Sequence, residues 1–229
     1  MEKNLPELER SLGIDFKDKD ILKQAFIHRS YLNEHPEEKL SHNERLEFLG
    51  DAVLELAVTR HLYFTYPNPE GDLTNWRAAL VNSKILSKTS TDLGFNDFLL
   101  LSRGEAKDMG RARQFILANT VEAFIGALYL DKGFGQCEEF VAAHIIKELP
   151  AIIEEERYRD PKSKFQEEAQ ERVGITPTYE VLKEWGPDHA KHFVIGVFLE
   201  SELVAQGEGD SKQDAQEEAA KEALEVKKW

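Results

Sequence analysis

The sequence has little cysteine, little positive charge and no long uninterrupted apolar segment. Its 229 residues include one cysteine, Cys137, which excludes an intramolecular disulfide and favours a reducing compartment. Acidic residues outnumber basic ones by 43 to 29, and the resulting net charge of −14 is unusual for a nucleic-acid-binding protein. The most apolar stretch, FILANTVEAFIGALYL, is interrupted by Glu122 and is too short to cross a bilayer. These features predict a soluble cytoplasmic protein without a membrane partner.

The spacing of apolar residues divides the chain into two parts. Up to about residue 150 they return every three or four positions, which predicts one helix after another. A charged segment at residues 154–160 suits a linker, and beyond it a helix, three strands and a closing helix are predicted. In the first part the expected helical segments are residues 42–66, 72–94 with Gly94 as the C-cap, 115–130, and 137–149 ending at Pro150.

The strand and helix predictions after the linker rest on two local patterns. Apolar residues occupy every second position of KHFVIGVFLE, at Phe193, Ile195, Val197 and Leu199, as in a strand with one buried face. Ser211 is a good N-cap for the last helix, because Asp214 follows three residues later as in a capping box.

The segment HNERLEFLGDAVLEL, residues 42–56, places four acidic residues on one stripe of a predicted helix. Glu44, Glu47, Asp51 and Glu55 follow each other at steps of three, four and four. Like charges at this spacing destabilise a helix by about 0.2–0.5 kcal/mol per pair. Taken alone, this segment favours a solvated helix face opposite an apolar one.

Glu122 changes that balance because its neighbours in the sequence are almost all apolar. An unpaired carboxylate buried there costs several kcal/mol or takes up a proton. A distant arginine or an exposed helix edge would relieve this cost. Alternatively, Glu47, Asp51, Glu122 and the side-chain carbonyl of Asn119 form an oxygen-rich site for Mg²⁺ or Mn²⁺. Such sites promote phosphodiester hydrolysis.

HNERLEFLGDAVLEL resembles the signature of the ribonuclease III family. PEGDLTNWRAALVNSKILSK and LLLSRGEAKDMGRARQFILANTVEAFIGALYLDKGF are also similar to this family, and the region from DPKSKFQEE through GPDHAKHF to GEGDSKQDAQEEAAKEAL resembles a double-stranded RNA-binding domain. The resemblance implies a multi-domain chain. It comprises an all-α endonuclease domain at residues 1–153, a linker at 154–160 and a small α-β-β-β-α domain at 161–229.

The resemblance also implies an activity and its partners. The expected enzyme is a homodimer that cleaves double-stranded RNA by metal-dependent hydrolysis, leaving 5′-phosphate and 3′-hydroxyl ends in rRNA and mRNA processing. The expected cofactor is Mg²⁺, for which Mn²⁺ can substitute, and no small organic cofactor is expected.

The family's site residues are carried over position by position. Asp51 and Glu122 would lie closest to the chemistry, Glu44 would support the site, and Glu70 resembles a further acidic position. The candidate catalytic residues are thus Glu44, Glu47, Asp51 and Glu122, and the candidate metal ligands are Glu47, Asp51, Asn119 and Glu122.

Asn119 departs from the family pattern, which commonly has Asp before TVEA. An amide oxygen can accept a metal but brings no negative charge, so weaker metal affinity is expected. Phe48 is expected to pack across the dimer interface, with ordinary core packing as the alternative. A duplex RNA-binding protein with weakened or lost catalysis is the main rival prediction, motivated by Asn119, and a helical interaction scaffold is a third.

For the second domain the resemblance assigns an RNA-binding surface, although residues 151–229 are themselves acidic. The first helix would contact one minor groove and the loop GPDHAK the next, while the last helix begins near the phosphates between them. For each residue a capping or surface role is the alternative. The residues so assigned are Ser163, Gln166, Glu167, His189, Ser211 and Lys212.

Overall fold

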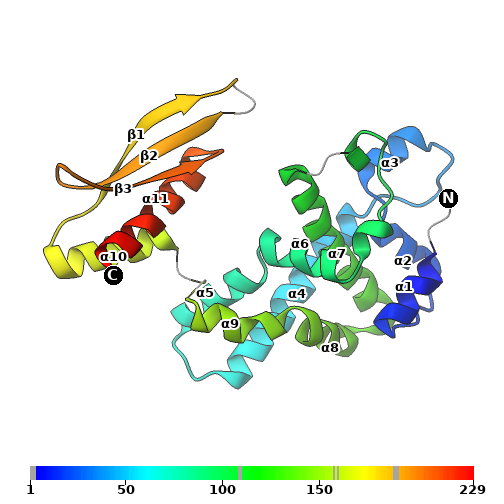
Figure 1. Cartoon of the computed structure of the whole chain (residues 1–229). Helices are drawn as coiled ribbons and strands as arrows, with labels where there is room; N and C mark the ends of the chain where they lie inside the picture. Colours follow the sequence, from blue (N-terminus) through cyan, green and yellow to red (C-terminus); the bar gives the residue numbers. More distant parts are fainter. Residues whose placement is uncertain (1–3, 108–109, 157, 159, 188–190) are drawn as a thin grey trace. The chain divides into compact units, whose positions relative to one another are not determined.

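The computed structural model describes residues 4–107, 110–156, 158, 160–187 and 191–229 (Figure 1). The chain divides into two compact units, Met1–Tyr158 and Arg159–Trp229. Each unit has its own buried apolar core, and each is described by itself. No helix in the described part of the chain is long and apolar enough to cross a membrane.

The first unit is helical, as the sequence predicts. Short 3₁₀ segments join or extend its helices: η1 (Phe95–Asp97), η2 (Glu105–Lys107) and η3 (Ile146–Glu148). The α-helices are α1 (Leu5–Leu12), α2 (Lys19–Ala25), α3 (Arg29–Glu34), α4 (Glu44–Thr65), α5 (Glu70–Leu80), α6 (Ser83–Asp92), α7 (Arg111–Lys132), α8 (Phe134–His144) and α9 (Leu149–Glu154).

Two long helices, α4 and α7, pack against each other in the middle of the first unit (Figure 1). Each has 22 residues and carries both buried and exposed apolar side chains. On the core side, the ring of Phe124 lies 5.0 Å from that of Phe95 and 5.6 Å from that of Phe16. Aromatic pairs at such distances add about 0.5–1.5 kcal/mol each beyond their burial, so this core holds α7 firmly in place.

Two helix boundaries differ from the sequence predictions. The segment 72–94 is not one helical stretch, because the Asn82 side chain accepts a hydrogen bond from the Ile85 N–H at 3.0 Å and starts α6 as a separate helix. Pro150 was expected to end a helix, but it stands in the first turn of α9. Proline is well tolerated there, since the N–H that it lacks has no helical partner at that position. Gly94 does follow α6 in the left-handed conformation, with φ 70°.

The second unit has the predicted α-β-β-β-α order. Its strands form an antiparallel sheet in the order β1-β2-β3, and α10 and α11 pack on one face of it. Gly207 of the sheet allows close contact, because a Cβ there would lie 2.1 Å from the Ala219 nitrogen of α11. The elements are α10 (Pro161–Val173), β1 (Thr178–Trp185), β2 (His192–Leu199), β3 (Glu202–Gly209) and α11 (Lys212–Lys227).

The alternation predicted for the second strand is confirmed. Phe193, Ile195, Val197 and Leu199 of β2 are all buried against the helices. The predicted cap of the last helix is also confirmed, because the Ser211 Oγ accepts a hydrogen bond from the Asp214 N–H at 3.1 Å.

Candidate active site

Two glycines let the backbones of α4 and α7 touch. A Cβ on Gly50 would lie 1.7 Å from the carbonyl oxygen of Glu122, and one on Gly126 would lie 2.2 Å from that of Leu46. No side chain fits at either position. Glycine in a helix interior costs about 1 kcal/mol relative to alanine, so both residues are there for close contact rather than for helix stability. The contact places the Glu122 turn of α7 against the acidic stripe of α4.

The carboxylates of Glu47, Asp51 and Glu122 are consequently close enough to repel one another. Burial raises the pKa of Glu122 to about 8, and the charges of Asp51 and then Glu47 add to the rise. The pKa of Glu47 is also raised, first by burial and then by the charge of Glu44, with a smaller contribution from Asp51. Burying the Glu122 carboxylate as an anion therefore costs free energy in the folded protein, as the sequence suggested.

These carboxylates do not form a complete metal site by themselves in the part of the chain that the structure describes. Within the described ranges, no group of three His, Cys, Asp or Glu residues is arranged to hold a metal ion by itself. Mg²⁺ needs fewer protein ligands than this, because it usually keeps several waters and binds through one or two carboxylates together with substrate phosphates. The hard oxygen donors of Glu47, Asp51 and Glu122 fit such an ion, and its double charge would offset their repulsion.

Asn119 contacts this group through a hydrogen bond to Glu47. The bond lowers the pKa of Glu47 and partly opposes the effect of burial. Because a carboxylate only accepts hydrogen bonds, the Asn119 amide nitrogen is the donor, and its oxygen remains available as a ligand. Asn119 lies one turn before Glu122 on α7, so it belongs to the same contact between the two helices.

A hollow of about 420 Å³ opens beside Glu47 and Asn119. Glu44 also lines it, with its carboxylate 3.6 Å from the Arg29 guanidinium and 3.7 Å from the Nδ1 of His42. The N-terminus of α4 is fixed here, since the buried Asn43 donates a hydrogen bond to the Ala25 carbonyl at 3.1 Å. The hollow is lined by His28, Arg29, Asn43, Glu44, Glu47, Glu105, Ala112, Phe115, Ile116 and Asn119.

The second unit presents most of the predicted RNA-binding residues on its helices. Ser163, Gln166 and Glu167 are exposed on α10, at the spacing of one helix face. The Ser163 hydroxyl also donates to the capping carboxylate of Asp160 at 2.8 Å, so the alternative capping role is partly realised.

At the start of α11, the exposed Lys212 lies with its Nζ 5.7 Å from the centre of the Phe193 ring. Ser211 caps this helix, so its alternative role is realised too. The predicted contact residue His189 lies outside the described residues.

Comparisons with known proteins agree with both units. Residues 18–149 match the family model described as ribonuclease-III-like, and residues 161–227 match the model of the double-stranded RNA binding motif. Ribonuclease 3 of Streptococcus pneumoniae (strain P1031) is 45% identical over 219 residues, which is 95% of this chain and 94% of the relative. Ribonuclease 3 of Oceanobacillus iheyensis is 44% identical over 218 residues, 95% of each chain.

The chain belongs to the ribonuclease III family. It is accordingly a metal-dependent endoribonuclease acting on double-stranded RNA, as the sequence predicts. A solved nuclease domain of ribonuclease III from Campylobacter jejuni, studied for flexibility in the region involved in its dimer formation, is similar to the first unit. It has a TM-score of 0.58 and 41% identity, over 64% of this chain and 99% of that one.

Among the described residues of this ribonuclease III chain, Phe48 is the most exposed large apolar side chain, at 83%. Core packing within the subunit, the alternative considered for it, is therefore wrong. Leu56 of α4 is also exposed, at 54%. Further apolar residues exposed on α4 and α7 are Tyr63, Phe64, Phe115, Tyr129 and Leu130.

Glu70 lies in a different place from the other acidic residues of this family's signature. It is exposed at the start of α5, accepts a hydrogen bond from the Thr74 hydroxyl at 3.0 Å, and lines a separate hollow with Tyr63 and Arg77. Although Glu70 resembles an acidic site position of the family, it does not lie at the α4–α7 contact.

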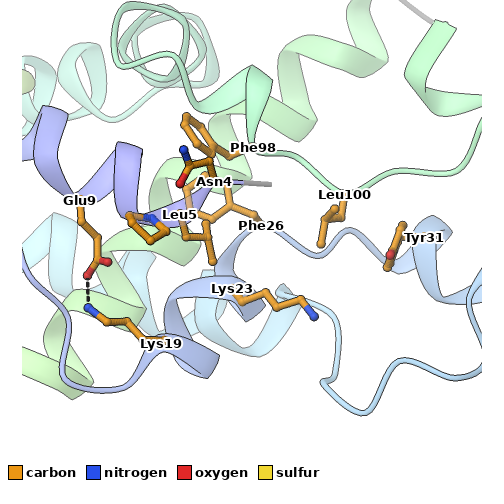
Figure 2. A pocket seen from close by; sticks show the side chains of 10 residues that line it. Asn4, Leu5, Glu9, Lys19, Lys23, Phe26, Tyr31, Phe98 and Leu100 are labelled. Carbon is orange, nitrogen blue, oxygen red and sulfur yellow. Dashed lines mark hydrogen bonds and ion pairs between the residues drawn. The ribbon is translucent and has the colours of Figure 1, made fainter. Parts of the chain in front are cut away.

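Another hollow of the ribonuclease III unit does not resemble a catalytic site. It measures about 520 Å³ and lies beneath α1, with mostly apolar walls that include Leu5, Phe26 and Phe98 (Figure 2). Its charged groups are engaged: the Lys19 Nζ lies 2.6 Å from Glu9, and the Lys23 Nζ lies 2.7 Å from Glu38.

Sequence reasoning missed three residues that shape the site. Gly50 and Gly126 set the distance between the helices, and Arg29 contacts Glu44. A signal for the glycines was available, because each stands inside a strongly predicted helix where alanine would be preferred. Nothing in the local pattern distinguished Arg29, since its contact with Glu44 joins two helices.

Proposed function

We propose that this chain is a Mg²⁺-dependent endonuclease that hydrolyses both strands of double-stranded RNA. The observation that carries the proposal is the position of Glu122 on α7 beside Glu47 and Asp51 on α4, with a pKa raised to about 8. A cluster that destabilises the protein is most readily explained by a positively charged ligand. The double-stranded RNA binding motif on the same chain supports duplex RNA as the substrate.

The α4–α7 contact would provide the metal ligands. Glu47, Asp51, Glu122 and the Asn119 oxygen are the groups that would hold the ion. When bound, Mg²⁺ supplies positive charge that polarises the phosphodiester and makes water a better nucleophile at neutral pH. Mn²⁺, which also prefers carboxylate, carbonyl and water ligands, can substitute.

The remaining contribution of the chain is to orient the attacking water. Asp51 is exposed and Glu122 is half-buried, so both carboxylates can accept a hydrogen bond from a water beside the phosphate. Water attacks phosphorus and the bond to the 3′ oxygen breaks, which leaves a 5′-phosphate and a 3′-hydroxyl. Glu44 supports the site at the first residue of α4, where its carboxylate lies 3.6 Å from the Arg29 guanidinium and 3.7 Å from the Nδ1 of His42.

Exposed apolar side chains of α4 and α7 would form the homodimer interface. A second copy of the chain would cover Phe48 and the neighbouring exposed apolar side chains, and the two active sites would each cut one strand. Large exposed apolar patches on soluble proteins are commonly interaction sites. The Campylobacter jejuni nuclease domain, to which the first unit is similar, has a region involved in dimer formation.

The second unit would bind the RNA through α10 and the start of α11. Ser163, Gln166 and Glu167 would face one minor groove, and Ser211 and Lys212 would meet the adjacent phosphates. Lys212 and Gln213 are exposed in the first turn of α11, where backbone N–H groups can bind those phosphates. Ribosomal and messenger RNA precursors are the natural duplexes of this class. We place the enzyme in the cytoplasm, where the buried free thiol of Cys137 stays reduced.

A cleavage assay on a long RNA duplex tests this function. With Mg²⁺ we expect ends bearing 5′-phosphates, and with EDTA we expect intact RNA. Glu122→Gln keeps the side-chain shape, removes the charge and should abolish cleavage. A gel-shift experiment in Ca²⁺ then checks binding separately. A shifted duplex that wild-type protein never cuts in Mg²⁺ would leave only the binding-protein alternative, and an unshifted, uncut duplex would leave only the scaffold.

A further inference from the structure

The hollow beside Glu47 contains one arginine among several acids. Glu44, Glu47 and Glu105 line it with negative charge, and Arg29 lines it from α3. His28 lies in the same wall, but burial lowers the pKa of its imidazole below the usual 6.5, so it is neutral at pH 7. Of the lining side chains that the structure describes, Arg29 is the one that carries positive charge at neutral pH.

The contact between Arg29 and Glu44 leaves the guanidinium available to another anion. Their nearest atoms are 3.6 Å apart, whereas a charge-assisted hydrogen bond between such groups is about 2.7–2.9 Å long. The Arg29 side chain is 72% exposed, so solvent or a ligand can reach its N–H donors. Glu44 thus orients the arginine without using its hydrogen-bonding capacity.

The backbone that carries Arg29 is fixed on both sides. The His28 N–H donates to the Leu100 carbonyl at 3.1 Å, next to the isolated bridge between Ile27 and Leu100. Just after Arg29, the Ser30 hydroxyl accepts a hydrogen bond from the Ser102 N–H at 3.1 Å. These contacts keep the base of the arginine side chain beside the hollow.

We propose that Arg29 binds a phosphate of the RNA strand that enters this hollow, next to the phosphodiester that is cut. This inference rests on the proposed function. An RNA backbone carries a negative charge on each phosphate and must come close to three glutamates here. The divalent ion would neutralise the negative charge of the phosphate that reacts. The adjacent phosphate of the same strand needs a second cation. A guanidinium suits this task, because its planar donors bind two phosphate oxygens at once.

Duplex binding in Ca²⁺, measured from about 50 to 200 mM salt, tests the role of Arg29 in the full-length chain. Binding weakens with salt in proportion to the number of phosphates neutralised. Arg29→Gln should weaken binding roughly tenfold and reduce the slope of log affinity against log salt by about 0.9 per engaged arginine. Arg29→Lys keeps the charge and should preserve most of the slope. Arg10→Gln, the same change at an exposed arginine of α1, should match wild type.

Cleavage kinetics distinguish phosphate binding from support of Glu44. If Arg29 binds phosphate, Arg29→Gln raises KM and leaves the Mg²⁺ concentration for half-maximal activity unchanged. If Arg29→Gln instead leaves the salt slope unchanged and raises that Mg²⁺ concentration, Arg29 only positions Glu44 and the inference is overturned. Wild-type protein that leaves duplex RNA intact overturns the proposed function itself, and the inference falls with it.

Discussion

Glu122→Gln should make the metal-free protein more stable at alkaline pH, although it abolishes the activity. The folded-state pKa of Glu122 is about 8, against 4.5 for an unperturbed glutamate. Below pH 4.5 the side chain is protonated in both the folded and the unfolded chain. Between pH 4.5 and 8 the unfolded chain releases the proton while the folded chain keeps it, so stability falls as pH rises. Above pH 8 the loss is complete.

The size of this effect follows from the shift. A difference of about 3.5 pKa units corresponds to about 5 kcal/mol. Glu122 is only half-buried, so solvent screens part of this cost, and we expect about 1–3 kcal/mol. Glutamine has nearly the same shape and no charge, so the variant should regain that energy at pH 8.5 and show little difference from wild type near pH 5.

The assay is urea denaturation of metal-free protein across this pH range, followed by the same measurement with Mg²⁺. An ion that binds the native state stabilises it by mass action, so Mg²⁺ should raise wild-type stability more than that of the variant. Glu55→Gln, the same change at the exposed end of the α4 stripe, is the matched control and should gain at most a few tenths of a kcal/mol.

Two results would refute the reasoning about Glu122. Equal stabilities of wild type and Glu122→Gln at pH 8.5 without metal would mean that the carboxylate is neither buried nor repelled by its neighbours. An equal response to Mg²⁺ would mean that Glu122 does not contribute to ion binding.

Three further substitutions test separate parts of the structure. Asn119→Asp should lower the Mg²⁺ concentration for half-maximal cleavage by a factor on the order of 3 to 10, since one more charge near the ion contributes about 1 kcal/mol. An unchanged Mg²⁺ titration would count against Asn119 as a ligand. Gly126→Ala should lower the free energy of unfolding, measured by urea denaturation, by about 3 kcal/mol or more, because its methyl group would clash with the Leu46 carbonyl. The control is Gly135→Ala in α8, which has open space around it and should be neutral or stabilising. Phe48→Glu should give a folded monomer by light scattering; a persistent dimer would exclude Phe48 from the interface.

Local patterns were enough to predict that the first unit is helical and to give the order of elements in the second. The alternation of Phe193, Ile195, Val197 and Leu199 directly reflects a sheet with one buried face, which is why it could be read from sequence. Helix boundaries were harder, because Asn82 starts a new helix through its own hydrogen bond and Pro150 is compatible with either end of a helix.

The sequence by itself determined the family, the two kinds of domain and the acidic stripe, since each depends on residues that are near one another in the chain. Only the tertiary structure decided that Glu122 meets Glu47 and Asp51, because that contact joins α4 to α7 through the bare backbones of Gly50 and Gly126. It also decided that Phe48 faces outward and that Asn119 donates to Glu47. Periodicity states which residues share a face of a helix, but the packing of distant helices decides what that face touches.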